Sequence, residues 1–285
     1  MDQDDISRLQ QEYGLSYHVH YAFLAEQLVG LKGKRVLEVG GSLPDRFVLN
    51  ELMASQWVAL EETNYWAETL STGYVLGTPP PMTGDKKCFS QAFPGDLVGH
   101  NLFYGRIEDL PVSLTGHFDV VFSIAAFEHI ARLPLALEKM HQALNSGGKL
   151  FALFAPVWSA YNGHHLPEIV DKAGNRWSFG NSPVPPWGHL LLRPMQLYDL
   201  LCSKTVSETA HEIVYFVYSS PHITRFFLED YMDMVVRSPF QAVHMTPMFP
   251  VDVPELVQGQ LSVRYPGRRN FSHNGLLLVL VRDLA

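Results

Sequence analysis

Histidines and acidic residues recur along this chain in pairs that could transfer a proton. Glu128-His129 follows an apolar run directly, and later segments rich in Gly, Pro and Trp contain His164, Glu168 and His189. An unperturbed imidazole titrates near pH 6.5, so it can take a hydroxyl proton while a carboxylate orients its ring. We expect the base to be His129, then His164, then His189, with Glu128 or Glu168 as the orienting acid. Turnover should then rise with pH through this region.

The same histidines allow two other interpretations. Histidine is a common metal ligand, but the spacing of His164, His165 and His189 matches no standard zinc pattern. Histidines in a loop are also often satisfied by backbone hydrogen bonds. The sequence therefore predicts no metal site and leaves the acid–base and structural interpretations open.

A glycine turn provides a second candidate site. The apolar run Val36–Val39, which contains Glu38, stops at Gly40-Gly41, and a helix-like pattern follows from Asp45. This order is typical of a buried parallel strand that turns tightly into a helix. Glycines there let a ligand approach the backbone, and a helix N-terminus offers free N–H groups. The dinucleotide fingerprint would need a third glycine near Asp45 or Arg46, which the chain lacks.

Strands and helices alternate from residue 35 to 155, which predicts a doubly wound α/β fold with a mostly parallel, seven-stranded sheet. The expected strands are 35–39, 57–60, 101–104, 118–124, 149–155, 212–218 and 275–282. The expected helices are 5–31, 46–55, 133–144 and 194–203.

We expect residues 1–285 to form a single domain. An N-terminal helical region would cover 1–33, and two lid insertions would cover about 156–195 and 221–273. Long loops without periodicity in a compact domain usually carry function. The second insertion is rich in Met and aromatic residues, which suit either the core or a lid over an acyl substrate.

Three segments resemble class I S-adenosylmethionine (SAM)-dependent methyltransferases. Val36–Gly41 resembles the first motif of that family, Arg106–Pro111 resembles its adenine-binding segment, and Phe118–Val121 with Glu128–Ile130 resembles its fourth strand and the turn after it. The resemblance implies a Rossmann-like methyltransferase fold and SAM as the cofactor. The cofactor-binding residues that it implies are Glu38, Gly40, Gly41, Glu61 at the ribose, Ile107 and Glu108 at the adenine, and Ser123.

Two further stretches narrow the resemblance. The segments 158–166 and 185–191 resemble O-methyltransferases of natural-product pathways, including the O-methyltransferase domains of polyketide synthases. This implies methyl transfer to a hydroxyl of a small natural product or a polyketide acyl group, free or bound to a carrier protein. The enzyme would be a free protein or part of a polyketide synthase. C- or N-methylation, a non-catalytic SAM-binding module and a dinucleotide oxidoreductase remain as alternatives.

Composition limits the partners and the compartment. The net charge is −8 and no basic patch interleaves with aromatic residues, so we expect no nucleic-acid binding. The two cysteines show no CxxC spacing, which suits a reduced compartment. The acidic N-terminus lacks the order of a signal peptide, and the apolar run Leu276–Val281 is too short to span a membrane. We expect a cytoplasmic protein without membrane contact.

Overall fold

The computed structural model describes residues 3–41, 43–61 and 87–283. A seven-stranded sheet has the order β3-β2-β1-β4-β5-β9-β8. Its strands are β1 Arg35–Val39, β2 Gln56–Glu61, β3 His100–Tyr104, β4 Phe118–Ile124, β5 Leu144–Phe154, β8 Gln241–Pro250 and β9 His273–Val281. Neighbouring strands from β3 to β5 pair in parallel, and β9 is antiparallel to both β5 and β8. The doubly wound, mostly parallel, seven-stranded fold is therefore confirmed.

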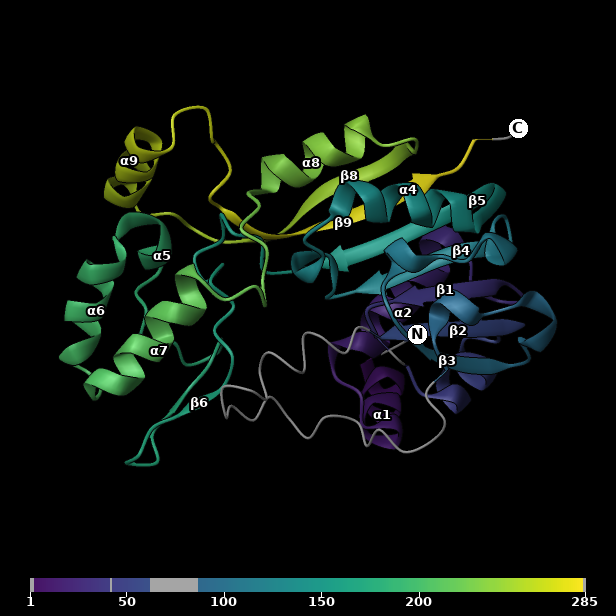
Figure 1. Cartoon of the computed structure of the whole chain (residues 1–285), viewed down its shortest axis with the longest axis horizontal. Coiled ribbons are helices and arrows are strands. Elements are labelled where there is room, and N and C mark those ends of the chain that lie inside the picture. Colours follow the sequence, from purple (N-terminus) through teal and green to yellow (C-terminus); the bar gives the residue numbers. More distant parts are fainter. Residues whose placement is uncertain (1–2, 42, 62–86, 284–285) are drawn as a thin grey trace.

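Helices cover both faces of the sheet because its central strands are apolar on both sides. Leu37 and Val121 point into a core with α4 (Leu133–Ala143) and α8 (Leu228–Arg237). Their strand neighbours Val36 and Val120 point to the opposite face, where α1 (Gln3–Tyr13) and α2 (Tyr17–Val29) contribute to the core. Figure 1 shows α4 and α8 on one side of the sheet and α1 and α2 on the other.

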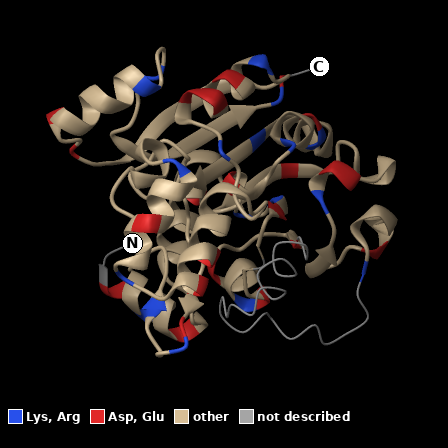
Figure 2. Cartoon of the chain, turned by 60° about the vertical axis from the view of Figure 1, so that its left-hand side comes forward, with Lys and Arg blue, Asp and Glu red and all other residues tan. Residues whose placement is uncertain are grey.

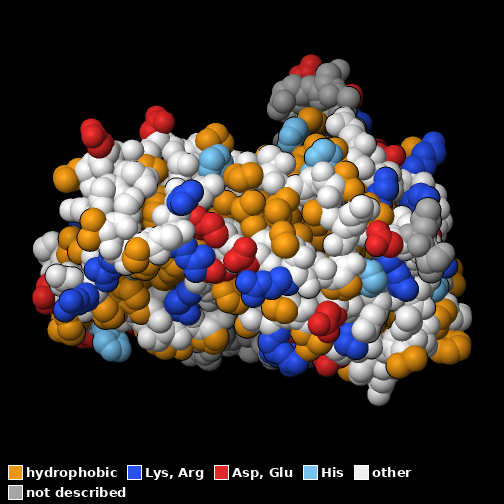
Figure 3. All heavy atoms as spheres, turned by 90° about the horizontal axis from the view of Figure 1, so that it is seen from above, with side chains coloured by type: hydrophobic (Ala, Val, Ile, Leu, Met, Phe, Trp, Pro, Cys, Tyr) orange, Lys and Arg blue, Asp and Glu red, His pale blue; other side chains and the backbone are white. Residues whose placement is uncertain are grey.

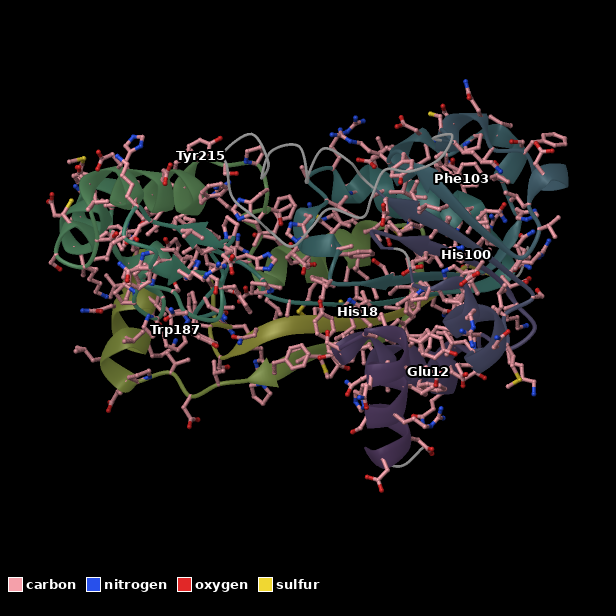
Figure 4. The ribbon with its side chains drawn as sticks, turned by 90° about the horizontal axis from the view of Figure 1, so that it is seen from below. Glu12, His18, His100, Phe103, Trp187 and Tyr215 are labelled. Atoms are coloured by element: carbon pink, nitrogen blue, oxygen red, sulfur yellow. The ribbon has the colours of Figure 1, made fainter. Side chains whose placement is uncertain are left out.

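A helical unit lies beside the sheet and has its own hydrophobic core, which includes Trp158, Trp187 and Phe216. Its elements are β6 Ile169–Val170, β7 Arg176–Trp177, α5 Gly188–Leu191, α6 Pro194–Cys202, α7 Ser207–Tyr218 and α9 Glu255–Arg264. Figure 1 places this unit at the end of the molecule opposite β3. In Figure 4 Trp187 lies within it, whereas His100 and Phe103 lie at the other end.

Short helices occupy several connections. After β1 the chain forms a π-helix, η1, over Phe47–Glu51. The 3₁₀ helices are η2 Phe89–Gln91, η3 Pro94–Asp96, η4 Ile107–Asp109, η5 Val112–Leu114 and η6 Phe127–His129.

Four sequence-based boundaries were wrong. The sixth strand was predicted over 212–218, but these residues form the end of α7, whose buried Ala210, Ile213 and Val217 follow helical spacing. The strand is β8 instead, so the predicted insertion 221–273 contains two elements of the main domain, α8 and β8. The helix predicted over 5–31 is two helices separated at Gly14, and the helix predicted over 46–55 is only the π-helix η1.

Figure 2 shows Lys and Arg interspersed with Asp and Glu along the ribbon. Within the described ranges, no helix is both long enough and apolar enough to cross a membrane.

Candidate active site

A cavity of about 780 Å³ opens at the carboxyl ends of the parallel strands, where open α/β sheets bind their ligands. One wall is formed by the residues that follow or end β1, β2, β3 and β4. The other wall comes from α2, the helical unit and β8. The residues of that wall include Tyr17, Tyr21, His165, Phe179, Pro221, His222 and Phe249.

The glycine turn after β1 is shaped by a close backbone approach within the protein. Gly40 has φ +91°, and a Cβ atom at this position would lie 2.1 Å from the Cβ atom of Ala126. Its N–H donates to the carbonyl of Leu60 over 2.9 Å. Gly40 is therefore required by its positive φ and by the chain segment after β4, a cause that differs from the ligand approach inferred from the sequence.

The buried side chain of Glu38 stabilises this turn by hydrogen bonds within the protein. Its carboxylate accepts hydrogen bonds from the backbone N–H of Leu43, at 3.0 Å, and from Nε1 of Trp57, at 2.6 Å. Burial raises the pKa of Glu38 to about 7, against the lowering effect of these bonds. The buried Ser123 hydroxyl donates to the carbonyl of Val39 over 2.8 Å. Glu38 and Ser123, predicted to bind a cofactor, thus bond to protein groups and are absent from the cavity lining.

Glu61, Ile107 and Glu108 line the cavity together with Gly40 and Gly41. Strands β2 and β3 pair in register up to Glu61, and the next residue along, Gly105, donates its N–H to the carbonyl of Glu61 over 3.0 Å. The turn after β1, the acid at the end of β2 and the segment after β3 therefore converge at one end of the cavity, as the sequence predicted.

Glu128 brings a buried carboxyl group to the cavity. The residue is 0% exposed, and neither of its carboxyl oxygens has a side-chain partner or a hydrogen bond of normal geometry among the described residues. Burial raises its pKa to about 8, against a lowering effect of the backbone N–H groups of Glu128 and Ala155. Its backbone is fixed because its carbonyl accepts a 2.7 Å hydrogen bond from the N–H of Thr224, and the adjacent Phe127 ring stacks on Phe154.

His129, also at the cavity, is oriented by a backbone carbonyl. Its Nδ1 hydrogen-bonds the carbonyl oxygen of His222, and a carbonyl oxygen can only accept, so Nδ1 carries the proton. Nε2 of the neutral ring is then the basic nitrogen. Burial lowers the pKa of His129 to about 4, against a raising effect of the bond to His222. The ring is oriented by His222, and neither Glu128 nor Glu168 takes the orienting role predicted from the sequence.

Residues 64–152 match a family model described as a methyltransferase domain. Over this part of its length the chain is therefore similar to methyltransferases. No protein of the curated set matches the sequence.

Solved methyltransferases resemble the chain along most of its length at low identity. A SAM-dependent methyltransferase from Mesorhizobium loti is 15% identical, with a TM-score of 0.46 and coverage of 94% of this chain and 98% of its own. A putative SAM-dependent methyltransferase from Listeria monocytogenes is 15% identical, with a TM-score of 0.44 and coverage of 92% and 96%. A phosphoethanolamine N-methyltransferase 2 from Haemonchus contortus, in complex with S-adenosylhomocysteine, is 15% identical, with a TM-score of 0.48 and coverage of 94% and 53%.

SAM fits the end of the cavity that Gly40, Gly41, Glu61, Ile107 and Glu108 form. A carboxylate such as that of Glu61 can accept two hydrogen bonds from the ribose diol. The cavity volume of about 780 Å³ lies in the range of about 300–1,000 Å³ that is typical of ligand pockets. Glu128 and His129 line the same cavity.

Three predicted catalytic residues lie outside the cavity lining, in the helical unit. Nδ1 of His164 accepts a hydrogen bond from the N–H of Leu166 at 3.1 Å, and Nε2 of His189 donates to the carbonyl of Trp158 at 2.8 Å. Glu168 pairs with Arg176 at 2.7 Å. The sequence-based prediction that His164, His189 and Glu168 lie at the active site is therefore wrong. Their contacts keep all three side chains within the helical unit.

Two cavity histidines were missed. His165 lies with its ring centroid 5.1 Å from that of His129, and Nε2 of His222 donates to the carbonyl of His165 over 3.0 Å. His165 stands next to a residue that was chosen, and His222 stands in the Ser-Pro-His step after α7, where no motif marks it. Among the described residues, no three His, Cys, Asp or Glu side chains gather in a metal-binding arrangement, and the lack of a metal requirement stays a prediction.

Proposed function

We propose that this protein transfers the methyl group of SAM to a hydroxyl of a small, largely apolar molecule. The observation that carries the proposal is the tautomer of His129. The bond from Nδ1 to the His222 carbonyl leaves Nε2 as a base, in the same cavity as the glycine turn and Glu61.

The chemistry assigned to this chain is proton removal and alignment. Bound SAM would supply an electrophilic methyl group. Gly40, Gly41 and Glu61 would hold the cofactor, and Nε2 of His129 would take the proton of the acceptor hydroxyl as its oxygen received the methyl group. Holding the oxygen in line with the methyl group can supply roughly 7–11 kcal/mol, and a positioned base adds typically about 10²–10⁴-fold in rate.

The walls of the cavity support an apolar acceptor. Tyr17, Tyr21, Ile130, Phe179 and Phe249 line it opposite or beside the histidines. We therefore propose a natural product or polyketide acyl group as the substrate, free or bound to a carrier protein. We place the enzyme in the cytoplasm, as a free protein or as part of a polyketide synthase. This part of the proposal is supported by the likeness of residues 158–166 and 185–191 to natural-product O-methyltransferases.

Product analysis with SAM labelled in its methyl group tests the proposal. We expect the label on an oxygen atom of the acceptor. A label on carbon or nitrogen would establish one of the alternative reactions of the same fold. Binding of SAM without turnover across a broad acceptor panel would favour a non-catalytic binding module.

A further inference from the structure

The side chain of Glu128 has no function within the protein that the described contacts explain. It is fully buried, yet it lines the cavity, and neither carboxyl oxygen has a side-chain partner or a hydrogen bond of normal geometry among the described residues. The backbone N–H groups of Glu128 and Ala155 lower its pKa, but burial outweighs them. Burying an unsatisfied polar group opposes folding, and such a group in a native structure calls for a partner. A partner supplied by a bound ligand meets this requirement.

The chain cannot easily turn this carboxyl group away from the cavity. Glu128 is the middle residue of η6, whose N-terminal residue Phe127 is fully buried against Phe154. The backbone of Glu128 is bonded to Thr224, on the segment that also supplies the His222 carbonyl to His129. Glu128 and His129 are therefore presented to the cavity by one rigid turn.

The surroundings of Glu128 favour a neutral partner. Burial and then the charge of Glu128 raise the pKa of Tyr17, which places this tyrosine near the carboxyl group. No cationic side chain contributes to the pKa of Glu128, and burial favours its protonated form. A protonated carboxyl has one donor and free acceptor capacity, which complements a hydroxyl.

We propose that Glu128 binds a second hydroxyl of the acceptor, distinct from the hydroxyl that is methylated at His129. This inference rests on the proposed function, because it takes the methylated group to be a hydroxyl. It assigns the substrate to the class of apolar molecules that carry at least two hydroxyl groups. Glu128 then selects the acceptor, whereas His129 takes the proton.

Binding of two matched probes tests the proposal. Catechol carries two neighbouring hydroxyls and phenol carries one, and calorimetry measures the affinity of each for the full chain saturated with S-adenosylhomocysteine. We expect catechol to bind at least about tenfold more tightly than phenol, the scale of one hydrogen bond to a buried group. Equal affinities, or no binding of catechol, would overturn the proposal.

Two substitutions at Glu128 sharpen the test. Glu128→Leu should abolish the preference for catechol, whereas Glu128→Gln should keep most of it, because the neutral amide still has a donor and an acceptor. Glu138→Gln, on the exposed side of α4, is the matched control and should behave as the parent. A preference that survives in Glu128→Leu would exclude this residue. Loss of the preference in both Glu128 variants would overturn the proposed binding of the hydroxyl by a neutral carboxyl group.

Two readouts separate this proposal from its alternatives. The affinity for S-adenosylhomocysteine should be the same in the parent and in both Glu128 variants, and a large loss would assign Glu128 to the cofactor. The probe experiment measures binding and not methyl transfer. Transfer of the methyl group to nitrogen or carbon would therefore refute the proposed function, while the Glu128-dependent preference for catechol could still be observed. Thermal melting checks folding, and Glu128→Leu should melt no lower than the parent, since it removes an unpaired buried carboxyl.

Discussion

His129 owes its tautomer to a carbonyl that lies 93 residues away in sequence, on the segment after α7. Because the ring is packed among other residues, its pKa falls to about 4. This corrects the expectation of a rate that rises near pH 6.5. Nε2 is deprotonated at every pH above about 5, so the base is present throughout the neutral range.

Replacing His129 should therefore affect chemistry and leave cofactor binding intact. We expect His129→Ala to lower kcat by at least about tenfold, the low end of acid–base contributions, with an unchanged Kd for SAM. In the parent, kcat limited by this base should stay level between pH 5.5 and 7.5, a window that lies above the folded pKa of about 4. Single-turnover methyl transfer measures both effects. A rate close to that of the parent in a folded His129→Ala variant would remove this residue from the mechanism.

The proposed ribose contact of Glu61 makes a prediction for equilibrium binding. Glu61→Ala should weaken the binding of SAM by about 1–3 kcal/mol, the scale of hydrogen bonds lost from a charged group. This corresponds to a roughly 5- to 150-fold increase in Kd. Calorimetry with SAM and with S-adenosylhomocysteine gives the values, and Glu138→Ala on the exposed side of α4 serves as the control. Unchanged affinity in Glu61→Ala would place the ribose elsewhere in the cavity.

At the scale of elements, the turn after β1 positions the cofactor end of the cavity by packing against the segment after β4. Glu38 ties the turn to Trp57 in β2, and Gly40 leaves room for Ala126. These contacts connect β1 to β2 and to the segment after β4. Figure 1 shows β1, β2 and β4 side by side in the sheet.

Two glycine substitutions separate backbone strain from steric overlap. Gly14 and Gly40 both have positive φ, +65° and +91°, but an added Cβ atom meets nothing within 4 Å at Gly14 and meets Ala126 at 2.1 Å at Gly40. Gly14→Ala should lower the free energy of unfolding by about 1–2 kcal/mol, and Gly40→Ala should lower it by a further 1–3 kcal/mol or so, the cost of overpacking. Urea denaturation compares the two. Equal losses would mean that the turn relaxes away from Ala126.

At the scale of the whole molecule, the described residues form three hydrophobic cores. Two cores lie on the faces of the sheet and the third lies in the helical unit. In Figure 4 His18 lies between the two ends of the molecule, near its middle. Figure 3 shows histidines and hydrophobic side chains close together on the upper face.

The buried histidines and acids predict how stability depends on pH. His189 and His222 have folded pKa values of about 4, depressed from 6.5 by burial, so they contribute stability at high pH that is lost as pH falls from 6.5 toward 4. Glu38 and Glu128 have folded values of about 7 and 8, raised from 4.5, so stability is lost as pH rises from 4.5 through those values. His129 adds to the histidine effect. The more numerous histidines outweigh the two acids below pH 6.5, and only the acids act above it.

We therefore expect the free energy of unfolding to be greatest near pH 6.5. Urea denaturation from pH 4.5 to 8.5 measures the profile, in which each proton difference gives a slope of about 1.4 kcal/mol per pH unit. Glu128→Gln should flatten the alkaline side, and His189→Gln should flatten part of the acidic side. A profile that Glu128→Gln leaves unchanged would show that this acid titrates normally.

The local sequence determined the elements that are buried or strongly periodic. Strand β1 was predicted with its observed bounds, as was β4, because an apolar run bounded by polar residues has few alternative structures. Gly40, Gly41 and Glu61 were predicted to lie at the cofactor end of the cavity. The sequence could indicate them because each directly follows or ends a strand that was itself predicted. The resemblance to class I methyltransferases supplied the cofactor.

The tertiary structure decided what depends on contacts between distant segments. Residues 212–218 became a helix because their apolar side chains could pack in the core of the helical unit, a choice that an apolar run alone leaves open. His222 meets His129, and His164 and His189 turn inward, only because the chain between β5 and β8 folds over the sheet edge. Sequence spacing fixes which residues can transfer a proton, but packing fixes their tautomer, their pKa and whether they face the cavity.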